Sequence, residues 1–416
     1  METNKNDFFY QRNPAIDILR ALTVLLMIFV NDFWSVKGVP EWMQHAKSGV
    51  DFLGLSDIVY PIFLFVVGMS IPFALENRFR KGIEGENTLL HIFSRFFALL
   101  VMGAFTQQTL SMGQVPEMTV PIWKVWMVVG FFLIWNAYPK TDKKTVRYLY
   151  TALQIAGVLL LVYLAYIFRD REGRLMRSSY GILGSIGWAY LICALVYLIV
   201  RNHVPKIFFF WLGMLLYTMA TITAGKTTEP FTLIPREADL VRNLVDSVAR
   251  VSSTTVLTMG GVLFSLLLAK YAKLEVRKKI LFYGSLTAIL VVAAVLSHQC
   301  WIVSKLGATP PWVLYNSAIA IGAYGLLHWA VSSGKAHWFN IIKAGGTATL
   351  SCYVMPYLLQ GFFYTFKFGI LPKSLNAMLP VWAKTDMGGL IKCFIWALFC
   401  IGITALLEKY KVKLKI

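Results

Sequence analysis

Charge is scarce in this sequence, and acidic residues are the scarcest part of it. Charged residues make up 15% of the 416, with 21 Asp and Glu against 40 Lys and Arg. A soluble globular domain carries about 25% charged residues, so this chain has too few to cover an ordinary water-exposed surface. Hydrophobic residues make up 57% instead. The composition therefore argues against a typical soluble enzyme and favours a membrane protein.

Several motifs of soluble enzymes and metalloproteins are also missing. The sequence has no Walker loop, no G-x-G-x-x-G before a helix and no H-E-x-x-H. Its five cysteines show no C-x-x-C spacing and lie in or beside apolar runs, so we interpret them as packing residues and expect no metal site. The net charge of +19 lies mainly in connections between apolar runs, so we expect no nucleic-acid partner.

The apolar residues gather in about twelve runs of about 16–25 residues, the length that crosses a hydrocarbon core of about 30 Å. Strands of a transmembrane barrel would alternate over about 10 residues, which this sequence does not do. We therefore predict an all-α polytopic membrane protein, a bundle of about 10–12 transmembrane helices in a lipid bilayer. The predicted runs are 15–34, 57–75, 91–111, 120–138, 148–168, 182–200, 206–224, 251–271, 280–298, 312–332, 346–366 and 388–407.

The basic residues predict an orientation in the membrane. Most Lys and Arg fall after the second, fourth, eighth and last runs, in ENRFRKGIEGEN, PKTDKKTVR, KYAKLEVRKK and EKYKVKLKI. The positive-inside rule assigns these connections and both termini to the cytoplasm, and it places the connection with His45 outside. The basic stretch 168–179 departs from this alternation. Either a run between 120 and 168 is miscounted, or the arginines of that stretch do not set topology.

Three charged residues near the inner ends of runs each have two interpretations. Asp17 and Arg20 lie one helical turn apart and can form a local ion pair, with Arg20 reaching the lipid headgroups. Alternatively, Arg20 belongs to an anion site for a cytosolic ligand that carries phosphate. Arg95, near the start of the third run, has the same two interpretations.

Histidine 45 is one of two histidines that we expect on the outer side. The other is His298, which we interpret as an ordinary satisfied polar group. Asn31 ends the run before His45, and Asp57 opens the run after it. A neutral imidazole in that place can accept a proton near neutral pH, and a carboxylate can fix its tautomer. His45, Asn31 and Asp57 therefore form a candidate catalytic site.

The order of these residues resembles a known family. RNPAIDILRALTVLLMIFVND, followed by HA and by SDIVYPIFLFVVGMSIPFAL, is similar to the start of the heparan-α-glucosaminide N-acetyltransferase family. That family has R-x-x-S-L-D-x-x-R-G, then V-N, H-A and D-L-V-F-P-x-F-L-F-x-x-G. Weaker likeness continues in 177–195, 304–329 and 343–360. The chain departs from the pattern in that His45 and Asp57 lie two residues farther apart, and Gly184-Ser185 replaces a Gln-Arg pair.

The resemblance implies a transmembrane acetyltransferase. Members of the family move an acetyl group from cytosolic acetyl-CoA to the amine of a terminal glucosamine across the membrane. On that pattern His45 is catalytic, Asn31 stabilises the oxyanion and Asp57 orients the imidazole. Arg20 and Arg95 would bind the phosphates of acetyl-CoA, and no metal takes part. His45 acts either as a base in one step or as a carrier of the acetyl group in two.

The resemblance also implies one integral-membrane acyltransferase-like domain over residues 1–416, with 118–170 as a two-helix insertion. The acceptor would be an amino sugar or glycan on the periplasmic side of a bacterial inner (plasma) membrane, and a homodimer is compatible with this view. Two alternatives stay open. One is an O-acyltransferase that acts on a hydroxyl of a surface glycan, and the other is an amino-sugar transporter. The apolar midplanes of the first two runs weigh against transport.

Overall fold

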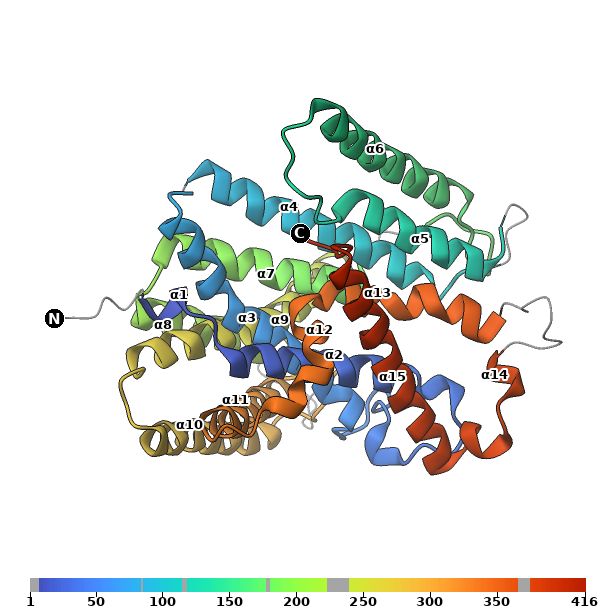
Figure 1. The fold of residues 1–416 in the computed structure, drawn as a ribbon. Coiled ribbons are helices and arrows are strands. Elements are labelled where there is room, and N and C mark those ends of the chain that lie inside the picture. Colours follow the sequence, from blue (N-terminus) through green and yellow to red (C-terminus); the bar gives the residue numbers. More distant parts are fainter. Residues whose placement is uncertain (1–6, 84, 114–117, 177–179, 223–238, 366–374) are drawn as a thin grey trace. The chain divides into compact units, whose positions relative to one another are not determined.

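The computed structural model describes residues 7–83, 85–113, 118–176, 180–222, 239–365 and 375–416. Helices form the regular structure of these ranges, together with a few isolated β-bridges (Figure 1). The long helices are α2 (Pro14–Asn31), α3 (Leu55–Arg80), α4 (Glu86–Gln108), α5 (Val120–Trp135), α6 (Lys144–Ile167), α7 (Gly181–Val200), α8 (Val204–Thr221), α9 (Asp239–Lys270), α10 (Val276–His298), α11 (Pro310–Ser332), α13 (Thr349–Gln360) and α15 (Asp386–Lys409). The short ones are α1 (Asp7–Tyr10), α12 (Lys343–Thr347) and α14 (Leu375–Met378).

Within the described ranges, 9 helices are long and apolar enough to cross a membrane. The predicted fold class is therefore confirmed: the chain is an all-α polytopic membrane protein, and the described part of each predicted apolar run overlaps a helix. The nine spans are Pro14–Ser35, Leu55–Arg80, Glu86–Gln108, Lys144–Ile167, Gly181–Val200, Val204–Thr221, Arg250–Lys270, Val276–His298 and Asp386–Lys409.

Three predicted runs differ from these spans. Helix α5 has 16 residues, which is short for a full crossing. Helix α11 has 23 residues, but Asn316, Ser317 and His328 interrupt its apolar sequence. The prediction of one continuous helix over 346–366 is wrong, because the backbone leaves helical geometry at Ala348 (φ −128°, ψ 42°) between α12 and α13.

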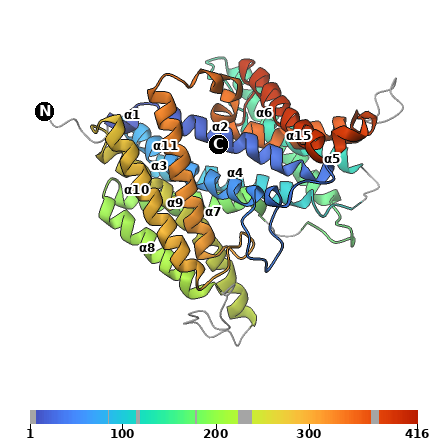
Figure 2. The ribbon, with the colours of Figure 1, turned by 90° about the horizontal axis from the view of Figure 1, so that it is seen from below.

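Two compact units divide the chain, and the division falls within α2, α4 and α7. The first unit comprises Met1–Thr23, Pro40–Phe96 and Ser185–Asn340. In this unit α9 packs against both α3 and α8, and α10 packs against α11. Figure 2 shows α10 and α11 running side by side. The residues from His45 to Asp57 belong to this unit.

The crossing of α3 and α9 depends on two glycines. A Cβ atom added to Gly68 would lie 1.8 Å from the carbonyl oxygen of Thr258, and one added to Gly261 would lie 2.0 Å from the carbonyl oxygen of Phe65. Small residues let two helix backbones approach closely inside a membrane. Helix α3 is therefore held firmly along its middle, which matters because it carries functional candidates near both ends.

The second unit comprises Val24–Val39, Phe97–Gly184 and Ile341–Ile416. Here α5 packs against α6 and α13, and the buried indole of Trp123 donates to the carbonyl oxygen of Leu164 at 3.1 Å. The α5–α6 pair occupies residues 118–170, which the resemblance treats as an insertion into a family core. That interpretation, and the single domain over the whole chain, stay predictions.

Candidate active site

The connection before α3 folds back against the first turn of that helix. A short 3₁₀ turn (Glu41–Met43) precedes His45, and Gly54 caps the start of α3. A Cβ atom on Gly54 would lie 2.0 Å from the carbonyl oxygen of Gln44, so a glycine is needed where the two segments meet. The hydroxyl of Ser56 donates to the carbonyl oxygen of Met43 at 2.6 Å and fixes the fold-back.

His45 and Asp57 are in direct contact. The Nδ1 atom of His45 lies 2.8 Å from Oδ1 of Asp57, and the backbone N–H of Ala46 donates to Oδ2 of Asp57 at 2.8 Å. The Asp57 side chain is 2% exposed, whereas that of His45 is 52% exposed. The first turn of α3 thus holds a buried carboxylate against the Nδ1 edge of a half-exposed imidazole.

A third charged side chain, Lys305, reaches the same pair from the connection between α10 and α11. Its Nζ atom lies 3.3 Å from His45 Nδ1 and 3.7 Å from Asp57 Oδ1, and it donates to the carbonyl oxygen of Ser56 at 3.2 Å. Burial lowers the pKa of the Lys305 ammonium, and the Asp57 carboxylate opposes that shift. The indole of Trp312 donates to the carbonyl oxygen of Asp57 at 3.1 Å and ties α11 to the same turn.

This arrangement has a definite chemical capacity. When Nδ1 of a neutral imidazole donates its proton to a carboxylate, the lone pair lies on Nε2. The Nε2 atom of His45 can then take a proton from an incoming group or attack a carbonyl carbon. The site has the parts of a base or nucleophile with an orienting acid, from His45 and Asp57.

Asn31, the third predicted catalytic residue, lies exposed at the last position of α2 and belongs to the second unit. Its role beside His45 stays a prediction. The next residue is a buried acid instead: Asp32 is 1% exposed and pairs with Lys392 at 3.3 Å. Lys392 is itself 9% exposed and also donates to the hydroxyl of Ser35. This buried ion pair joins the end of α2 to the start of α15.

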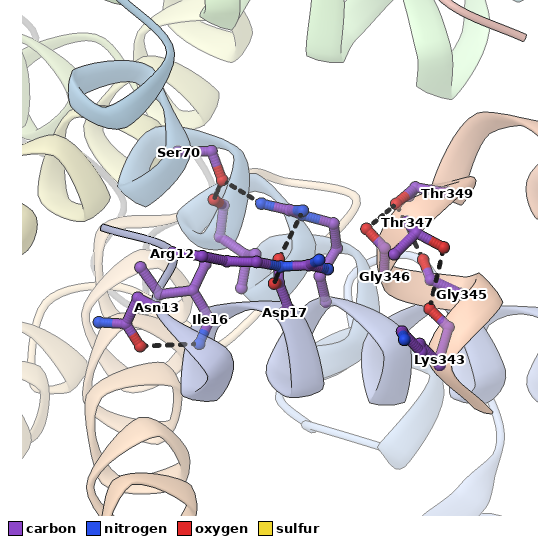
Figure 3. A network of polar contacts seen from close by, with 12 residues as sticks. Arg12, Asn13, Ile16, Asp17, Ser70, Lys343, Gly345, Gly346, Thr347 and Thr349 are labelled. Carbon is purple, nitrogen blue, oxygen red and sulfur yellow. Dashed lines mark hydrogen bonds and ion pairs between the residues drawn. The ribbon is translucent and has the colours of Figure 1, made fainter. Parts of the chain in front are cut away.

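At the other end of α3, Asp17 lies among cationic side chains of the N-terminal segment. Arg20 pairs with Asp17 at 3.3 Å and donates to the hydroxyl of Ser70, so the predicted local ion pair is present. Arg12 pairs with Asp17 as well, and Figure 3 shows the two side chains directed toward each other. Asn13 caps the start of α2 by accepting from the backbone N–H of Ile16.

These residues border a pocket of about 320 Å³ in the first unit. Arg12, Arg20, Ser70 and Asn77 supply polar groups to its wall, and aromatic rings, among them that of Phe73, supply an apolar face. Ser70 stands 13 positions after Asp57 on α3, which corresponds to about 20 Å along the helix. The pocket and the His45 site therefore lie toward opposite ends of one rigid helix.

Arg95 is not part of that wall. Its guanidinium lies over the ring of Tyr190, 4.6 Å from the ring centroid, and its buried Nε has no hydrogen-bond partner among the described residues. A cation over an aromatic face is a sufficient structural reason for a partly buried arginine. The predicted contact of Arg95 with phosphate stays a prediction.

His298 has a hydrogen-bond partner, as we predicted for an ordinary polar group. Its Nε2 atom lies 2.9 Å from Oδ1 of Asp51, and Asp51 also accepts from the backbone N–H of Val303 at 2.8 Å. The pair fastens the connection after α10 to the connection that contains His45. His298 is thus a structural histidine, and it serves below as a control.

Sequence reasoning missed Lys305, Lys392 and the polar wall that Ser70 and Asn77 supply. Lys392 could have been found, because a lysine inside an apolar run is costly and is normally paired. Lys305 lay in one of the segments that resemble the acetyltransferase family, but nothing in the sequence placed it beside His45. As for metals, the described residues contain no group of three or more His, Cys, Asp or Glu side chains placed to bind one.

Comparison with known proteins shows a matching family and a distant relative. Residues 12–234, more than half of the chain, match the model of a family described as a domain of unknown function, DUF5009. The chain is also similar to heparan-alpha-glucosaminide N-acetyltransferase of Mus musculus, with 29% identity over 92 residues. That stretch covers 22% of this chain and 13% of the mouse protein, so the likeness is that of a distant relative over a short segment.

Proposed function

The chain belongs to the DUF5009 family, and we propose that it is a membrane acetyltransferase that uses acetyl-CoA and His45 to acetylate an amine on the opposite side of the membrane. The distant likeness to a transmembrane N-acetyltransferase supports a transferase in general terms. The acetyl donor, the acceptor and the role of His45 are the further content of the proposal.

The contact of His45 with Asp57 is the observation that carries this proposal. Asp57 is nearly inaccessible and takes the Nδ1 side of the ring, while the imidazole is half exposed. Here Nε2 of His45 is available to a substrate.

The reaction would proceed as follows. The amine nitrogen of the acceptor attacks the thioester carbonyl carbon, a C–N bond forms, and the C–S bond to CoA breaks. His45 Nε2 takes the proton that the amine loses, and that proton then passes to the CoA thiolate. In the two-step form, Nε2 first attacks the thioester, releases CoA and hands the acetyl group to the amine. Asp57 holds the ring in orientation in both forms.

The pocket at the other end of α3 has the chemistry that the nucleotide end of acetyl-CoA requires. A guanidinium has five N–H donors suited to phosphate oxygens, and Asp17 pairs with Arg12 through its Nε atom. The aromatic face that includes Phe73 offers a stacking surface for adenine. The phosphates would lie against Arg12 and Arg20, and the acetyl end would extend toward His45.

The acceptor belongs to the outer side in this proposal. Glucosamine-type sugars of periplasmic glycans fit the family resemblance, and the membrane would be a bacterial inner membrane with both termini in the cytoplasm. The test is incubation of the purified protein with labelled acetyl-CoA and a panel of sugars with and without a free amine. Label in an N-acetyl product supports the proposal. Label only in O-acetyl products indicates a hydroxyl acceptor, and no transfer to any sugar refutes an acetyltransferase.

The topology gives a separate prediction. A cysteine at Ser48, which is exposed in the connection that contains His45, should react with a membrane-impermeant thiol reagent added outside intact cells. The background should carry Cys300→Ser, since the other four native cysteines are buried. A cysteine at Asn87, in the first turn of α4 after a basic connection, should react only after the inner face is opened. The reverse labelling pattern would place His45 on the cytoplasmic side, and it would contradict the proposed transfer across the membrane.

The pocket gives a prediction about binding. Arg20→Ala should weaken acetyl-CoA binding by about 1.5–3 kcal/mol, the range for a charge-assisted hydrogen bond. The fold should persist, because Arg12 still pairs with Asp17. Binding is measured with radiolabelled acetyl-CoA on the purified protein, with Arg277→Ala at the start of α10 as the control. Equal affinity in Arg20→Ala and wild type would leave Arg20 as an ion-pair residue alone. A loss in Arg95→Ala as well would extend the phosphate site toward α4.

A further inference from the structure

Lys305 is a buried charge that the proposed chemistry does not yet use. Its side chain is 20% exposed, and its polar contacts within the described part of the chain are with the ring of His45, the carboxylate of Asp57 and the carbonyl oxygen of Ser56. A lysine held in this way has lost most of its solvent and rotamer freedom. Because this loss of solvation and rotamer freedom is unfavourable, it points to a role of Lys305 at the His45 site.

Hydrogen-bond chemistry limits what Lys305 can do. An ammonium has three donors and no acceptor, so it cannot receive the proton on His45 Nδ1. The proton on Nδ1 goes to Asp57 Oδ1, the closer partner at 2.8 Å against 3.3 Å for Lys305. Lys305 then directs its donors to the Ser56 carbonyl oxygen and to Asp57. In this arrangement all three groups are satisfied, and the lone pair of His45 stays on Nε2.

The charges of the three groups also have a consequence. In a simple histidine–carboxylate pair, the negative charge favours a protonated, positive imidazole. Here Asp57 is already balanced by Lys305, so a second proton on His45 would bring an uncompensated positive charge next to an ammonium. Within the described part of the first unit, Asp57 from α3 and Lys305 from the α10–α11 connection are the charged groups in contact with His45.

We infer that Lys305 is a positioning residue that acts through His45: its ammonium balances Asp57 and disfavours a second proton on the imidazole, so that Nε2 keeps its lone pair. Its importance for catalysis rests on the proposed function. Its effect on the protonation of His45 does not, and can be measured without any substrate.

The substrate-free experiment uses diethyl pyrocarbonate, which reacts with neutral imidazole. The full-length protein is treated from about pH 5.5 to pH 7.5, the range in which imidazoles titrate, and modification of each histidine is followed by mass spectrometry of its peptides. In Lys305→Met the reactivity of His45 should fall off at a pH about one unit higher than in wild type, the smallest shift expected from removal of an adjacent like charge. Lys305→Arg keeps the charge and should keep the wild-type profile.

His298 is the internal control, because among the described residues its Nε2 pairs with Asp51, whereas Lys305 contacts His45. Its profile should be the same in all three proteins, and a change there would identify a folding defect. An unchanged His45 profile in Lys305→Met, with His298 also unchanged, overturns the inference. Once an acceptor is known, kcat in Lys305→Met should fall selectively at acid pH while the KM for acetyl-CoA stays constant. A purely structural lysine would lower activity equally at every pH.

Discussion

Replacing His45 with alanine is expected to lower acetyl transfer by about 100-fold or more, the effect of removing a general base. The affinity for acetyl-CoA should change little, because the arginine-lined pocket lies about 20 Å or more from His45 along α3. The variant should remain folded and inserted, since the imidazole is half exposed and outside the packed spans. Initial rates with labelled acetyl-CoA and the best amine acceptor give the comparison.

Two further variants make that result specific. Asp57→Asn should have a milder effect on the rate than His45→Ala, because an amide oxygen can still accept from the ring while the base stays in place. His298→Ala should transfer acetyl groups at close to the wild-type rate, because its partner Asp51 keeps its bond to the backbone of Val303. Wild-type turnover in His45→Ala with any amine acceptor would show that this histidine is not catalytic.

The second large effect is expected at the buried ion pair of Asp32 and Lys392 in the second unit. Asp32→Ala should lower the free energy of unfolding by about 3–5 kcal/mol, because it leaves the ammonium of Lys392 buried without its counter-charge. Both side chains are 9% exposed or less, so water cannot replace the lost carboxylate. Reversible unfolding of the detergent-solubilised protein, followed by circular dichroism, measures the change.

The double variant Asp32→Asn with Lys392→Met is the control for this pair. Removing both charges should recover much of the stability, since a buried pair costs nearly as much in desolvation as it returns in attraction. If the single and the double variant are equally unstable, the loss comes from packing around Asp32 and the ion pair is not its cause.

Local sequence patterns were enough to predict most helices and one contact of the site. Runs of about 20 apolar residues leave few alternatives to a membrane helix. His45 and Asp57 were predicted to meet because they lie in one short connection and at the start of the next helix. The two extra residues between them, relative to the family pattern, do not prevent the contact, and Gly54 lets this segment pass close to the backbone of Gln44.

Contacts between distant parts of the chain could not be predicted in this way. Lys305 is separated from His45 by 260 residues, and its charge was indistinguishable from those that set topology. Lys392 is 360 residues from Asp32, and its place in an apolar run signalled a buried partner without identifying it. The break at Ala348 was missed because alanine is a good helix former, so its sequence gives no sign of a non-helical backbone.

Transfer across a sealed membrane tests the account most directly. The purified protein is reconstituted into vesicles, glucosamine is trapped inside, and labelled acetyl-CoA is supplied outside. The account predicts that labelled N-acetylglucosamine accumulates inside wild-type vesicles and stays absent from His45→Ala vesicles, while acetyl-CoA itself remains outside. Label that appears only when both substrates share one compartment, or that accumulates equally in His45→Ala vesicles, would contradict it.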